Sequence, residues 1–514
     1  MVWRLETSNG DEASKIKYEV LRYCNRGLDI GCGPRKVWPH LIGVDNLTDT
    51  KLFGIRMRPD IAISDASRLA MFADGSFDTV FSSHTLEHIV DYKAALREWW
   101  RVIAPGGHLT LYLPHRDLYP RIGQPGANPD HKHDFAPEHI VAAMREIAPD
   151  WTLLVNETRD QDDEYSFLQV YRREKNGEGQ RDKASEPKPE KSVGIVRVGG
   201  HGDALWASSV CANYKERGYH VTCYVGPTGG AVLKHDPNID DLVVFSDTVI
   251  PNDEAVAFWC HQAKRHTKWI NLIGSVENRL LPHETSYEFF LPQSVRHRLM
   301  NSNYLEMVHA YSDLPTTNFR QRYYPSAAEE AWAKRIRAEL PGPVVVINPA
   351  GSGPVKYWPY TQRLMELLAE RKIYSVALGD IKDESVLGVE PYGIYAGMEW
   401  PVRHALAYAL QADAVVATES LIANAVAFEP MLKVITLSHS SVENLTKHWT
   451  NTASAEPLAL GCYPCHRVHP PNYSFCARDT TTKAAACQAL ARPETIAKLV
   501  IEYLEKIGKL EPIA

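Results

Sequence analysis

The amino-acid sequence predicts an α/β protein built from several domains with mainly parallel sheets. Near the N-terminus, residues 27–45 combine two short apolar strands with a glycine turn between them. The alternation of strand, turn and helix starts again at residue 193 and once more at residue 343. Parallel strands require crossover connections, so this repeated alternation indicates parallel sheets. The length of 514 residues fits about three domains of ordinary size.

The first turn has the features of a nucleoside-binding loop. Leu28 and Ile30 alternate along a strand, and Gly31 and Gly33 allow the backbone to approach a ligand closely. Asp45 ends the next strand, where a carboxylate can accept hydrogen bonds from both ribose hydroxyls. The same glycine spacing also occurs in structural tight turns, so the pattern alone leaves both interpretations open.

The distance between the loop and the second strand separates two cofactor classes. Only nine residues, 35–43, lie between them. A dinucleotide-binding fold places its acidic residue about 20 residues on, after a full helix that faces the pyrophosphate. The short connection therefore favours a cofactor without a phosphate over a nicotinamide dinucleotide.

Further segments follow the loop in a fixed order: Asp65-Ala66, residues 77–88 (FDTVFSSHTLEH) and residues 96–114 (LREWWRVIAPGGHLTLYLP). Together with the loop, they resemble the small-molecule branch of the class I S-adenosylmethionine-dependent methyltransferases, from about residue 28 to residue 171. The resemblance implies a Rossmann-like fold that binds S-adenosylmethionine. It also implies the positions of the cofactor-binding residues: Asp29, Gly31 and Gly33 in the loop region, with the two glycines along the methionine moiety, Asp45 on the ribose, and Asp65 with Ala66 at the adenine.

Several histidines follow strands in this first domain and are candidate bases. His84, Glu87 and His88 come just after the strand predicted at residues 77–83, and His131 and His133 follow the last clear strand. In the methyltransferase family such positions face the methyl-transfer pocket, where a base can deprotonate the acceptor. We select His84 and His133 as candidate catalytic residues, although an isolated histidine is more often structural.

A polar segment at residues 175–192 marks the clearest domain boundary. It contains nine charged residues, two prolines and no large apolar side chain, so it is expected to form a solvated, flexible linker. The sequence thus predicts a first domain at residues 1–174 and two βαβ domains after the linker, at 193–330 and 331–514.

The second half carries four ordered features: Gly202-Asp203, residues 348–359 (NPAGSGPVKYWP), residues 418–424 (TESLIAN) and a late group of cysteines. From about residue 193 to residue 507 these resemble the heptosyltransferase-like glycosyltransferases of family nine. The resemblance implies a glycosyltransferase B-type fold, with two Rossmann domains facing each other across a cleft. It also implies a nucleotide-sugar donor.

Two residues of this half are candidates for the chemistry. Asp203 follows a strand turn at the mouth of a parallel sheet, where a partly desolvated carboxylate can take a proton from an acceptor hydroxyl. The alternative role of Asp203 is helix capping, which aspartate does readily. Lys356 can contact the donor diphosphate as a point charge, and the alternative is an ordinary solvated lysine.

The segment at residues 418–424 departs from the pattern of the family. The usual run D-T-G-x-x-H aligns with Glu419, Ser420, Leu421 and Asn424, so its glycine and histidine are absent. Ser420 begins a predicted helix whose amides suit a leaving diphosphate, and Asn424 completes the candidate donor-binding set with Lys356. A retained fold with altered chemistry is the alternative.

The four late cysteines have the spacing of a metal site. Cys462, Cys465, Cys476 and Cys487 form C-x2-C-x10-C-x10-C, and four thiolates can bind a structural zinc ion tetrahedrally. Buried free thiols are the alternative, and a disulfide is disfavoured in a reducing compartment.

Composition narrows the class of partner and the compartment. The net charge of −7 gives no general attraction to nucleic acid, and no apolar run approaches the roughly 20 residues of a membrane-spanning helix. We therefore expect a cytoplasmic protein without a membrane span, for which nucleic acid is an unlikely partner.

These observations lead to one reading and two alternatives. The reading is a bifunctional transferase, in which the methyltransferase and the glycosyltransferase act on one glycan or glycoconjugate. In the first alternative, the same two modules modify a nucleic-acid base. In the second, the glycosyltransferase-like half is a non-catalytic binding module for the methyltransferase.

Overall fold

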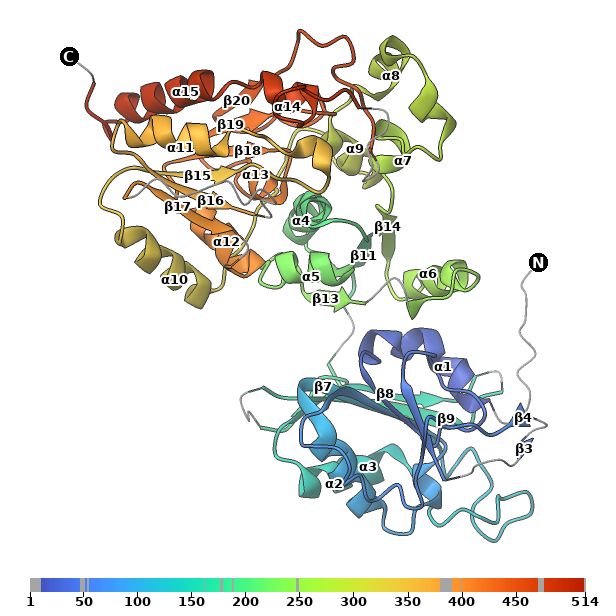
Figure 1. Cartoon of the computed structure of the whole chain (residues 1–514). Helices are drawn as coiled ribbons and strands as arrows, with labels where there is room; N and C mark the ends of the chain where they lie inside the picture. Colours follow the sequence, from blue (N-terminus) through green and yellow to red (C-terminus); the bar gives the residue numbers. More distant parts are fainter. Residues whose placement is uncertain are drawn as a thin grey trace. The chain divides into compact units, whose positions relative to one another are not determined.

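The computed structural model divides the chain into two compact units (Figure 1). Unit 1 comprises Met1–Glu190 and Phe245–Arg265, and unit 2 comprises Lys191–Val244 and His266–Ala514. The structure describes residues 11–46, 51–52, 55–161, 163–175, 179–186, 189–245, 249–379, 391–397, 399–469 and 476–512. Each unit is built around its own β-sheets.

Unit 1 contains an eight-stranded sheet in the order β10-β8-β9-β7-β6-β1-β2-β5. The strands from β5 to β7 pair in parallel, whereas β9 is antiparallel to both β7 and β8. This order confirms the predicted Rossmann-like fold, with the first strand at the centre of the parallel part. The strands are β1 (Gly27–Ile30), β2 (Ile42–Asp45), β5 (Ile61–Ala62), β6 (Phe77–Ser83), β7 (Ile103–Pro114), β8 (Trp151–Arg159), β9 (Ser166–Arg173) and β10 (Arg181–Asp182), and a separate pair is formed by β3 (Lys51–Leu52) and β4 (Ile55–Arg56).

The helices of unit 1 are amphipathic and bury one face on this sheet. In α2 (Tyr92–Val102), the Asp91 side chain caps the first turn by accepting a hydrogen bond from the amide of Ala94. The apolar face of this helix includes Leu96 and Trp99, both fully buried in the core of the unit. The other helical elements of the first segment are α1 (Glu12–Val20), α3 (Pro137–Ile147) and two short 3-10 turns, η1 (Leu21–Tyr23) and η2 (Leu86–His88).

The linker region differs from a free tether. Arg181–Asp182 form β10, which pairs in parallel with β8, and the amides of Lys183 and Ala184 both donate to the carbonyl of Leu153. Backbone groups pair regardless of side-chain polarity, so a polar sequence can still add an edge strand to a sheet. Parts of the predicted linker, residues 176–178 and 187–188, lie outside the described residues.

A segment of the second half of the sequence belongs to unit 1. Helix α6 (Ala255–Ala263) packs on α1. There the side-chain amide of Gln262 donates to the backbone carbonyl of Tyr18 at 2.7 Å. Phe258 is only 3% exposed, and its ring meets that of Tyr18 edge to face. The expected domain at residues 193–330 is therefore interrupted, because an apolar helix face within it completes the surface of α1.

Unit 2 contains the two further parallel sheets that the sequence predicts. The first has the order β13-β12-β11-β14, and the second has the order β17-β16-β15-β18-β19-β20. Both place the first strand in the interior and change direction beside it, as in doubly wound folds. The strands are β11 (Ser192–Arg197), β12 (His220–Val225), β13 (Asp241–Val244), β14 (Lys268–Asn271), β15 (Val344–Asn348), β16 (Tyr374–Leu378), β17 (Gly393–Gly397), β18 (Ala414–Thr418), β19 (Leu432–Thr436) and β20 (Thr452–Ala455).

The helices of unit 2 connect and cover these strands. The expected boundary at residue 331 falls inside α10, because Ser326 and Glu329 form a capping box that begins the helix earlier. The helices are α4 (His201–Glu216), α5 (Pro227–Leu233), α7 (Glu277–Leu280), η4 (Tyr287–Phe290), α8 (Gln293–Met300), α9 (Tyr304–Tyr311), α10 (Ala327–Ala338), η5 (Pro354–Lys356), α11 (Thr361–Ala369), α12 (Val402–Ala409), α13 (Leu421–Ala425), α14 (Ala486–Leu490) and α15 (Pro493–Lys506). Over the part of the chain that the structure describes, none of the helices has the length and apolarity needed to cross a membrane.

Substitution of Phe258 by alanine is expected to destabilise unit 1, although the residue lies in the second half of the sequence. Loss of a buried phenylalanine side chain costs about 3 kcal/mol or more. Calorimetry of the full chain should show a lower unfolding temperature for the transition of unit 1. The matched control is Val256→Ala on the same helix, where the side chain is 74% exposed and little change is expected. Equal effects of the two substitutions would contradict the packing of α6 on α1.

Candidate active sites

A deep cleft opens in unit 1 at the carboxyl ends of the parallel strands. Its volume is about 1170 Å³, and its walls come from the ends of β1, β2 and β6 and from loops around residues 64–68 and 128–132. Ligands bind at this edge of open parallel sheets. The cleft gathers all six predicted cofactor-binding residues and one of the two predicted catalytic histidines: Asp29, Gly31, Gly33, Asp45, Asp65, Ala66 and His84.

The glycine loop requires its glycines for two different reasons. Gly31 has φ +73°, and a Cβ there would lie 1.9 Å from the side-chain oxygen of Thr85. Gly33 has φ +58°, but a Cβ would meet nothing within 4 Å, so it borders open space. The amide of Gly33 donates to a carboxylate oxygen of Asp45 at 3.0 Å. This bond connects the loop to the end of β2 and fixes the position of the acidic side chain.

Asp29 lies at the floor of the cleft and is 2% exposed. Its carboxylate accepts a hydrogen bond from the amide of Val37 at 2.7 Å, which anchors the connection between β1 and β2. Burial raises the pKa of Asp29 to about 7, and the hydrogen bond from Val37 opposes this shift. Asp29 therefore shapes the loop as well as lining the cleft.

The predicted adenine-binding pair, Asp65 and Ala66, also lines the cleft. Asp65 accepts hydrogen bonds from the amide and the hydroxyl of Ser67, at 2.9 and 2.6 Å, and these bonds lower the pKa of Asp65. The carbonyl of Ala66 accepts a hydrogen bond from the indole of Trp99 at 2.9 Å. The segment is thus held in place from the core side, while its other face borders the cleft.

The two selected histidines have different positions. His84 lines the cleft, and its Nε2 lies 2.9 Å from the hydroxyl of Ser166. Burial lowers the pKa of His84 to about 3, so the ring is neutral. His133 is not among the residues that line the cleft, and its Nε2 lies 3.1 Å from the carbonyls of both Ile89 and Val90. A role for His133 as the base stays a prediction without support from its position.

Three other residues of the same region meet in the cleft instead. Glu87, His88 and His131 all line it, and their ligand atoms lie within 4.8 Å of one another. Burial raises the pKa of Glu87 to about 8. All three residues are candidates from the sequence. The sequence does not show that their side chains meet, because this depends on a contact between η2 and a loop more than 40 residues later.

Two aromatic residues of the cleft carried no sequence signal. Tyr119 and Tyr165 line it, and their ring centroids lie 5.0 Å apart. The hydroxyl of Tyr165 donates to a carboxylate oxygen of Glu12 at 3.2 Å, so the N-terminal helix α1 also closes this wall. Isolated tyrosines in loops and strand ends form no motif, and only the fold brings them together.

In unit 2, Asp203 lies in the first turn of α4. A carboxylate oxygen accepts a hydrogen bond from the amide of Gly200 at 2.8 Å, which is the capping role proposed as the alternative. The same oxygen lies 3.4 Å from Nη2 of Arg197, which is buried and also pairs with Glu277. Burial raises the pKa of Asp203, and the charge of Arg197 opposes this shift.

Lys356 ends the short 3-10 helix η5, and its Nζ lies 3.3 Å from the hydroxyl of Ser352. Its positive charge acts on two carboxylates of unit 2: it opposes the rise in the pKa of Asp203 and contributes to the lowered pKa of Glu419. The structure thus brings the predicted base and the predicted phosphate contact into one electrostatic environment.

Glu419 is 4% exposed and accepts hydrogen bonds from the amides of Ser438 and Ser440, at 2.6 and 3.2 Å. Nε2 of His439 lies 2.9 Å from its other carboxylate oxygen. Burial opposes ionisation, but His439 and these amides outweigh it and lower the pKa of Glu419 to about 2. Glu419 is a buried anion that organises the loop after β19.

The side chains of the other two candidate donor-binding residues make hydrogen bonds within unit 2. The hydroxyl of Ser420 accepts from the amide of Ala423 and caps the five-residue helix α13. The amide oxygen of Asn424 accepts from the indole of Trp206 at 2.9 Å, and its nitrogen donates to the carbonyl of Ser420 at 2.9 Å. Both side chains therefore have structural roles in unit 2.

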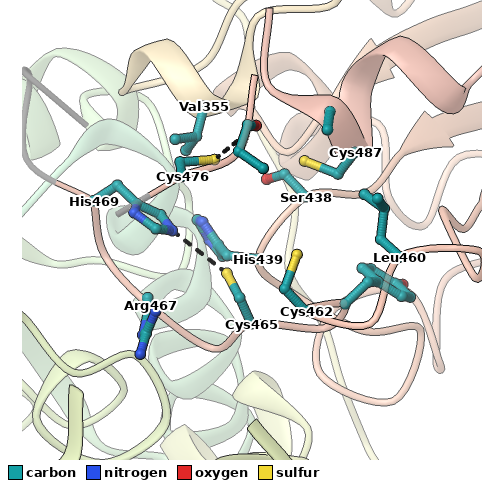
Figure 2. Close-up of a pocket in the computed structure, with 13 residues that line it drawn as sticks. Val355, Ser438, His439, Leu460, Cys462, Cys465, Arg467, His469, Cys476 and Cys487 are labelled. Carbon is teal, nitrogen blue, oxygen red and sulfur yellow. Dashed lines mark hydrogen bonds between the residues drawn. The ribbon is translucent and has the colours of Figure 1, made fainter. Parts of the chain in front are cut away.

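The four late cysteines line a small cavity of about 40 Å³ together with His439 and His469. Figure 2 shows their four sulfur atoms directed into the same space, with the sulfur of Cys465 lying 3.5 Å from Nε2 of His469. All four are free thiols, and no three of these described sulfurs come within 4.8 Å of one another. Burial raises the pKa of Cys465 to about 12 and that of Cys476 to about 11.

The sheet order and the glycine loop of unit 1 are features of a Rossmann-like fold, and its cleft lies where such folds bind ligands. A family model described as "Methyltransferase domain" matches residues 28–111, so the chain contains this domain and is a transferase. Demethylmenaquinone methyltransferase of Roseiflexus sp. is 31% identical over 111 residues, which cover 19% of this chain and 47% of that protein. The chain spans less than half the length of the methyltransferases of this name that it matches.

Solved structures similar to the rest of the chain are glycosyltransferases. A glycosyl transferase of family 9 from Veillonella parvula has a TM-score of 0.44 and 11% identity, and it covers 63% of this chain and 98% of its own. The ADP-heptose LPS heptosyltransferase II of E. coli has a TM-score of 0.43 and 13% identity, and it covers 62% of this chain and 99% of its own.

Replacement of Asp45 by alanine is expected to weaken the binding of S-adenosylmethionine by about 1.5–3 kcal/mol, because it removes hydrogen bonds to a charged group. Titration calorimetry should show this as an increase in Kd of roughly 10-fold to 150-fold. Asp78→Ala is the matched control, since Asp78 lies near the start of β6, at the edge of the sheet away from the cleft. An unchanged affinity in Asp45→Ala would refute the assignment of the ribose site.

Proposed function

We propose that the protein is a bifunctional transferase. Unit 1 transfers a methyl group from S-adenosylmethionine, and unit 2 transfers a sugar from a nucleotide-sugar donor, both to one glycan or glycoconjugate. The observation that carries the proposal is the cleft of unit 1, which gathers every residue expected to bind the methyl donor. Joining the two modules in one chain raises the effective concentration of the product of one near the site of the other.

The cleft has the volume and the hydrogen-bonding groups needed to bind S-adenosylmethionine. The open space beside Gly33 accepts the methionine moiety close to the backbone, and the carboxylate of Asp45 is positioned for the ribose hydroxyls. Asp65 and Ala66 offer a wall for the adenine on the opposite side. The sulfonium of this cofactor supplies an electrophilic methyl group, so the protein mainly has to align the acceptor and remove its proton.

The acceptor end of the cleft lies beyond the glycine loop, where His84, Glu87 and His131 line it. Because His84 is neutral, one of its ring nitrogens carries a lone pair. Its Nε2 lies near the hydroxyl of Ser166. A pKa near 3 makes His84 a weak proton acceptor at neutral pH, so the proton of an acceptor hydroxyl or amine leaves to solvent.

The proposed glycosyl transfer uses Asp203 and Lys356. Asp203 is buried enough for its carboxylate to be a stronger base than in water, and it adjoins the fixed charge of Arg197. Lys356 supplies positive charge for the departing diphosphate of the donor. Arg197 itself is bound to Glu277 at 2.5 Å and so serves as a positioning residue for Asp203.

One observation favours a second candidate function for unit 2. Both Ser420 and Asn424 use their side chains for hydrogen bonds within the unit, at positions where the family pattern has donor-binding residues. A glycosyltransferase fold whose donor segment has become structural would act as a binding module for the methyltransferase. Binding of an acceptor glycan without any donor hydrolysis or transfer would support this alternative.

The cysteine cavity is proposed to hold a structural zinc ion. Four sulfurs facing one space support it, although they have to move closer together to reach the distances of about 2.3 Å that zinc requires. Because the free thiols have raised pKa values, zinc binding must also release protons. Nine free cysteines fit a reducing, cytoplasmic location, which is part of the same proposal.

Mass spectrometry of small molecules that co-purify with the native protein tests the two-module proposal directly. We expect S-adenosylmethionine or its demethylated product together with a nucleotide or nucleotide sugar. Recovery of the methyl donor alone, and failure of unit 2 to bind any nucleotide sugar, would support the non-catalytic alternative for unit 2.

Substitution of Asp203 and Lys356 is expected to separate catalysis from donor binding. Asp203→Asn keeps an oxygen that can accept from the amide of Gly200, so the cap is retained while the base is lost. Transfer should fall by at least about 100-fold with nearly unchanged donor affinity. Lys356→Ala should chiefly raise the Kd of the nucleotide sugar, because the diphosphate is charged before and during the reaction.

The control for Lys356 is Lys334→Ala, a lysine on α10 that pairs with Glu330 one helical turn earlier and whose side chain is 60% exposed. The Lys334→Ala substitution should leave both the rate of sugar transfer and the Kd of the nucleotide sugar unchanged. Near-normal turnover of Asp203→Asn would refute the base assignment. Loss of folding in that variant, seen by circular dichroism, would instead support a purely structural role for Asp203.

A further inference from the structure

We infer that Glu87, His88 and His131 bind one divalent transition-metal ion at the acceptor end of the cleft in unit 1. The binding of the ion follows from the geometry of the three side chains. Its role in catalysis rests on the proposed methyl transfer.

The three ligand atoms are already close together. Oε1 of Glu87 lies 3.8 Å from Nε2 of His88 and 3.9 Å from Nε2 of His131. These distances are too long for hydrogen bonds. Ligand atoms that share a metal ion at about 2.1 Å lie roughly 3–3.5 Å apart, so shifts of about half an ångström would close the site.

The carboxylate of Glu87 provides a second and independent observation. Glu87 is fully buried, yet within the described residues neither of its carboxylate oxygens has a hydrogen-bond partner. Buried carboxylates are almost always paired, hydrogen-bonded or bound to a metal. An ion between the two imidazoles would supply the missing partner for this side chain.

The backbone holds the cluster together from both sides. The carbonyl of Glu87 accepts hydrogen bonds from the amides of Lys132 and His133, at 2.8 and 3.2 Å. These bonds fix the loop that carries His131 against the turn that carries Glu87 and His88. The rings of His88 and His131 meet edge to face with centroids 4.8 Å apart. Each ring has a nitrogen atom within 4.8 Å of the carboxylate of Glu87.

The donor set selects the class of ion. Two imidazole nitrogens and one carboxylate oxygen suit Zn²⁺, Fe²⁺ or Co²⁺, whereas Mg²⁺ and Ca²⁺ prefer oxygen ligands alone. Three protein ligands leave at least one coordination position open, as in catalytic rather than structural metal sites. Because all three residues line the cleft, the open position faces the space in which an acceptor would lie.

This arrangement indicates a hydroxyl-bearing acceptor. A Lewis acid beside the acceptor oxygen lowers the pKa of the hydroxyl, so that its proton leaves to solvent at neutral pH. The oxygen then forms a bond to the methyl carbon while the carbon–sulfur bond of the sulfonium breaks, and the electron pair of that bond stays on sulfur. The products are a methyl ether and a neutral thioether.

Cobalt binding to the full-length protein tests the site without requiring a known acceptor. After removal of metals with a chelator, the protein is titrated with Co²⁺, and bound Co²⁺ is followed by visible absorption and elemental analysis. We expect the wild-type protein to bind one more equivalent than Glu87→Gln and His88→Asn, or to bind it at least tenfold more tightly. The cysteine cavity is the same in all these proteins, so its contribution cancels.

The matched control is His133→Asn, which removes an imidazole from the same loop. The ring of His133 lies against the carbonyls of Ile89 and Val90, away from the cluster, so this variant should bind Co²⁺ like the wild type. Circular dichroism establishes that each variant is folded. Equal Co²⁺ binding by the wild type and by folded Glu87→Gln and His88→Asn would overturn the inference, as would an equal loss in His133→Asn.

Calorimetry with S-adenosylmethionine separates this inference from the proposed function. If the metal-free protein binds S-adenosylmethionine and no cluster-dependent Co²⁺ binding is found, the metal site is refuted and the methyltransferase proposal stands. If Co²⁺ binds through the cluster but S-adenosylmethionine does not bind, the site exists and its assigned catalytic role is refuted.

Discussion

Parallel strand pairing is the constraint on which both candidate sites depend. In a parallel sheet the carboxyl ends of neighbouring strands lie at one edge, and each is followed by a loop that faces the same space. In unit 1 this places the loops after β1, β2 and β6 around one cleft, and with them the glycine loop, Asp45 and Glu87. The hydrogen bond between the amide of Gly33 and Asp45 then fixes the acidic side chain at the end of β2 against the glycine loop.

Asn424 shows how one substitution can change the role of a whole segment. Its amide oxygen accepts from Trp206 on α4, and Gln321 donates to its backbone carbonyl, so α13 is joined to elements that precede the second sheet. A histidine at this position could carry a positive charge toward a diphosphate, whereas an asparagine cannot. Asn424 therefore contributes hydrogen bonds within unit 2 and no charge at this position.

The sequence predicted the elements whose signals are local. Gly31, Gly33 and Asp45 follow directly from strand and turn chemistry, and the restarts at residues 193 and 343 correspond to β11 and β15. The packing of α6 on α1 was not predictable, because an apolar helix face does not state which surface it will cover. The same holds for His131, which reaches Glu87 only through backbone hydrogen bonds made by the residues after it. The candidate base His133, two positions further on, is not among the residues that line the cleft, and spacing along the chain cannot show which side chains of a loop will face it.

The position of α6 changes how the two units are related along the chain. The chain leaves unit 1 after Glu190, returns at Phe245 and leaves again after Arg265. The methyltransferase is therefore not a simple N-terminal addition, since its completed surface includes Phe258 and Gln262 from a segment that lies between two strands of the first sheet of unit 2. Anything that displaces α6 affects the stability of unit 1 and, through the same stretch of chain, the connection between β13 and β14. The chain therefore crosses between the units three times, so the two units are joined at three points of the sequence rather than by one linker.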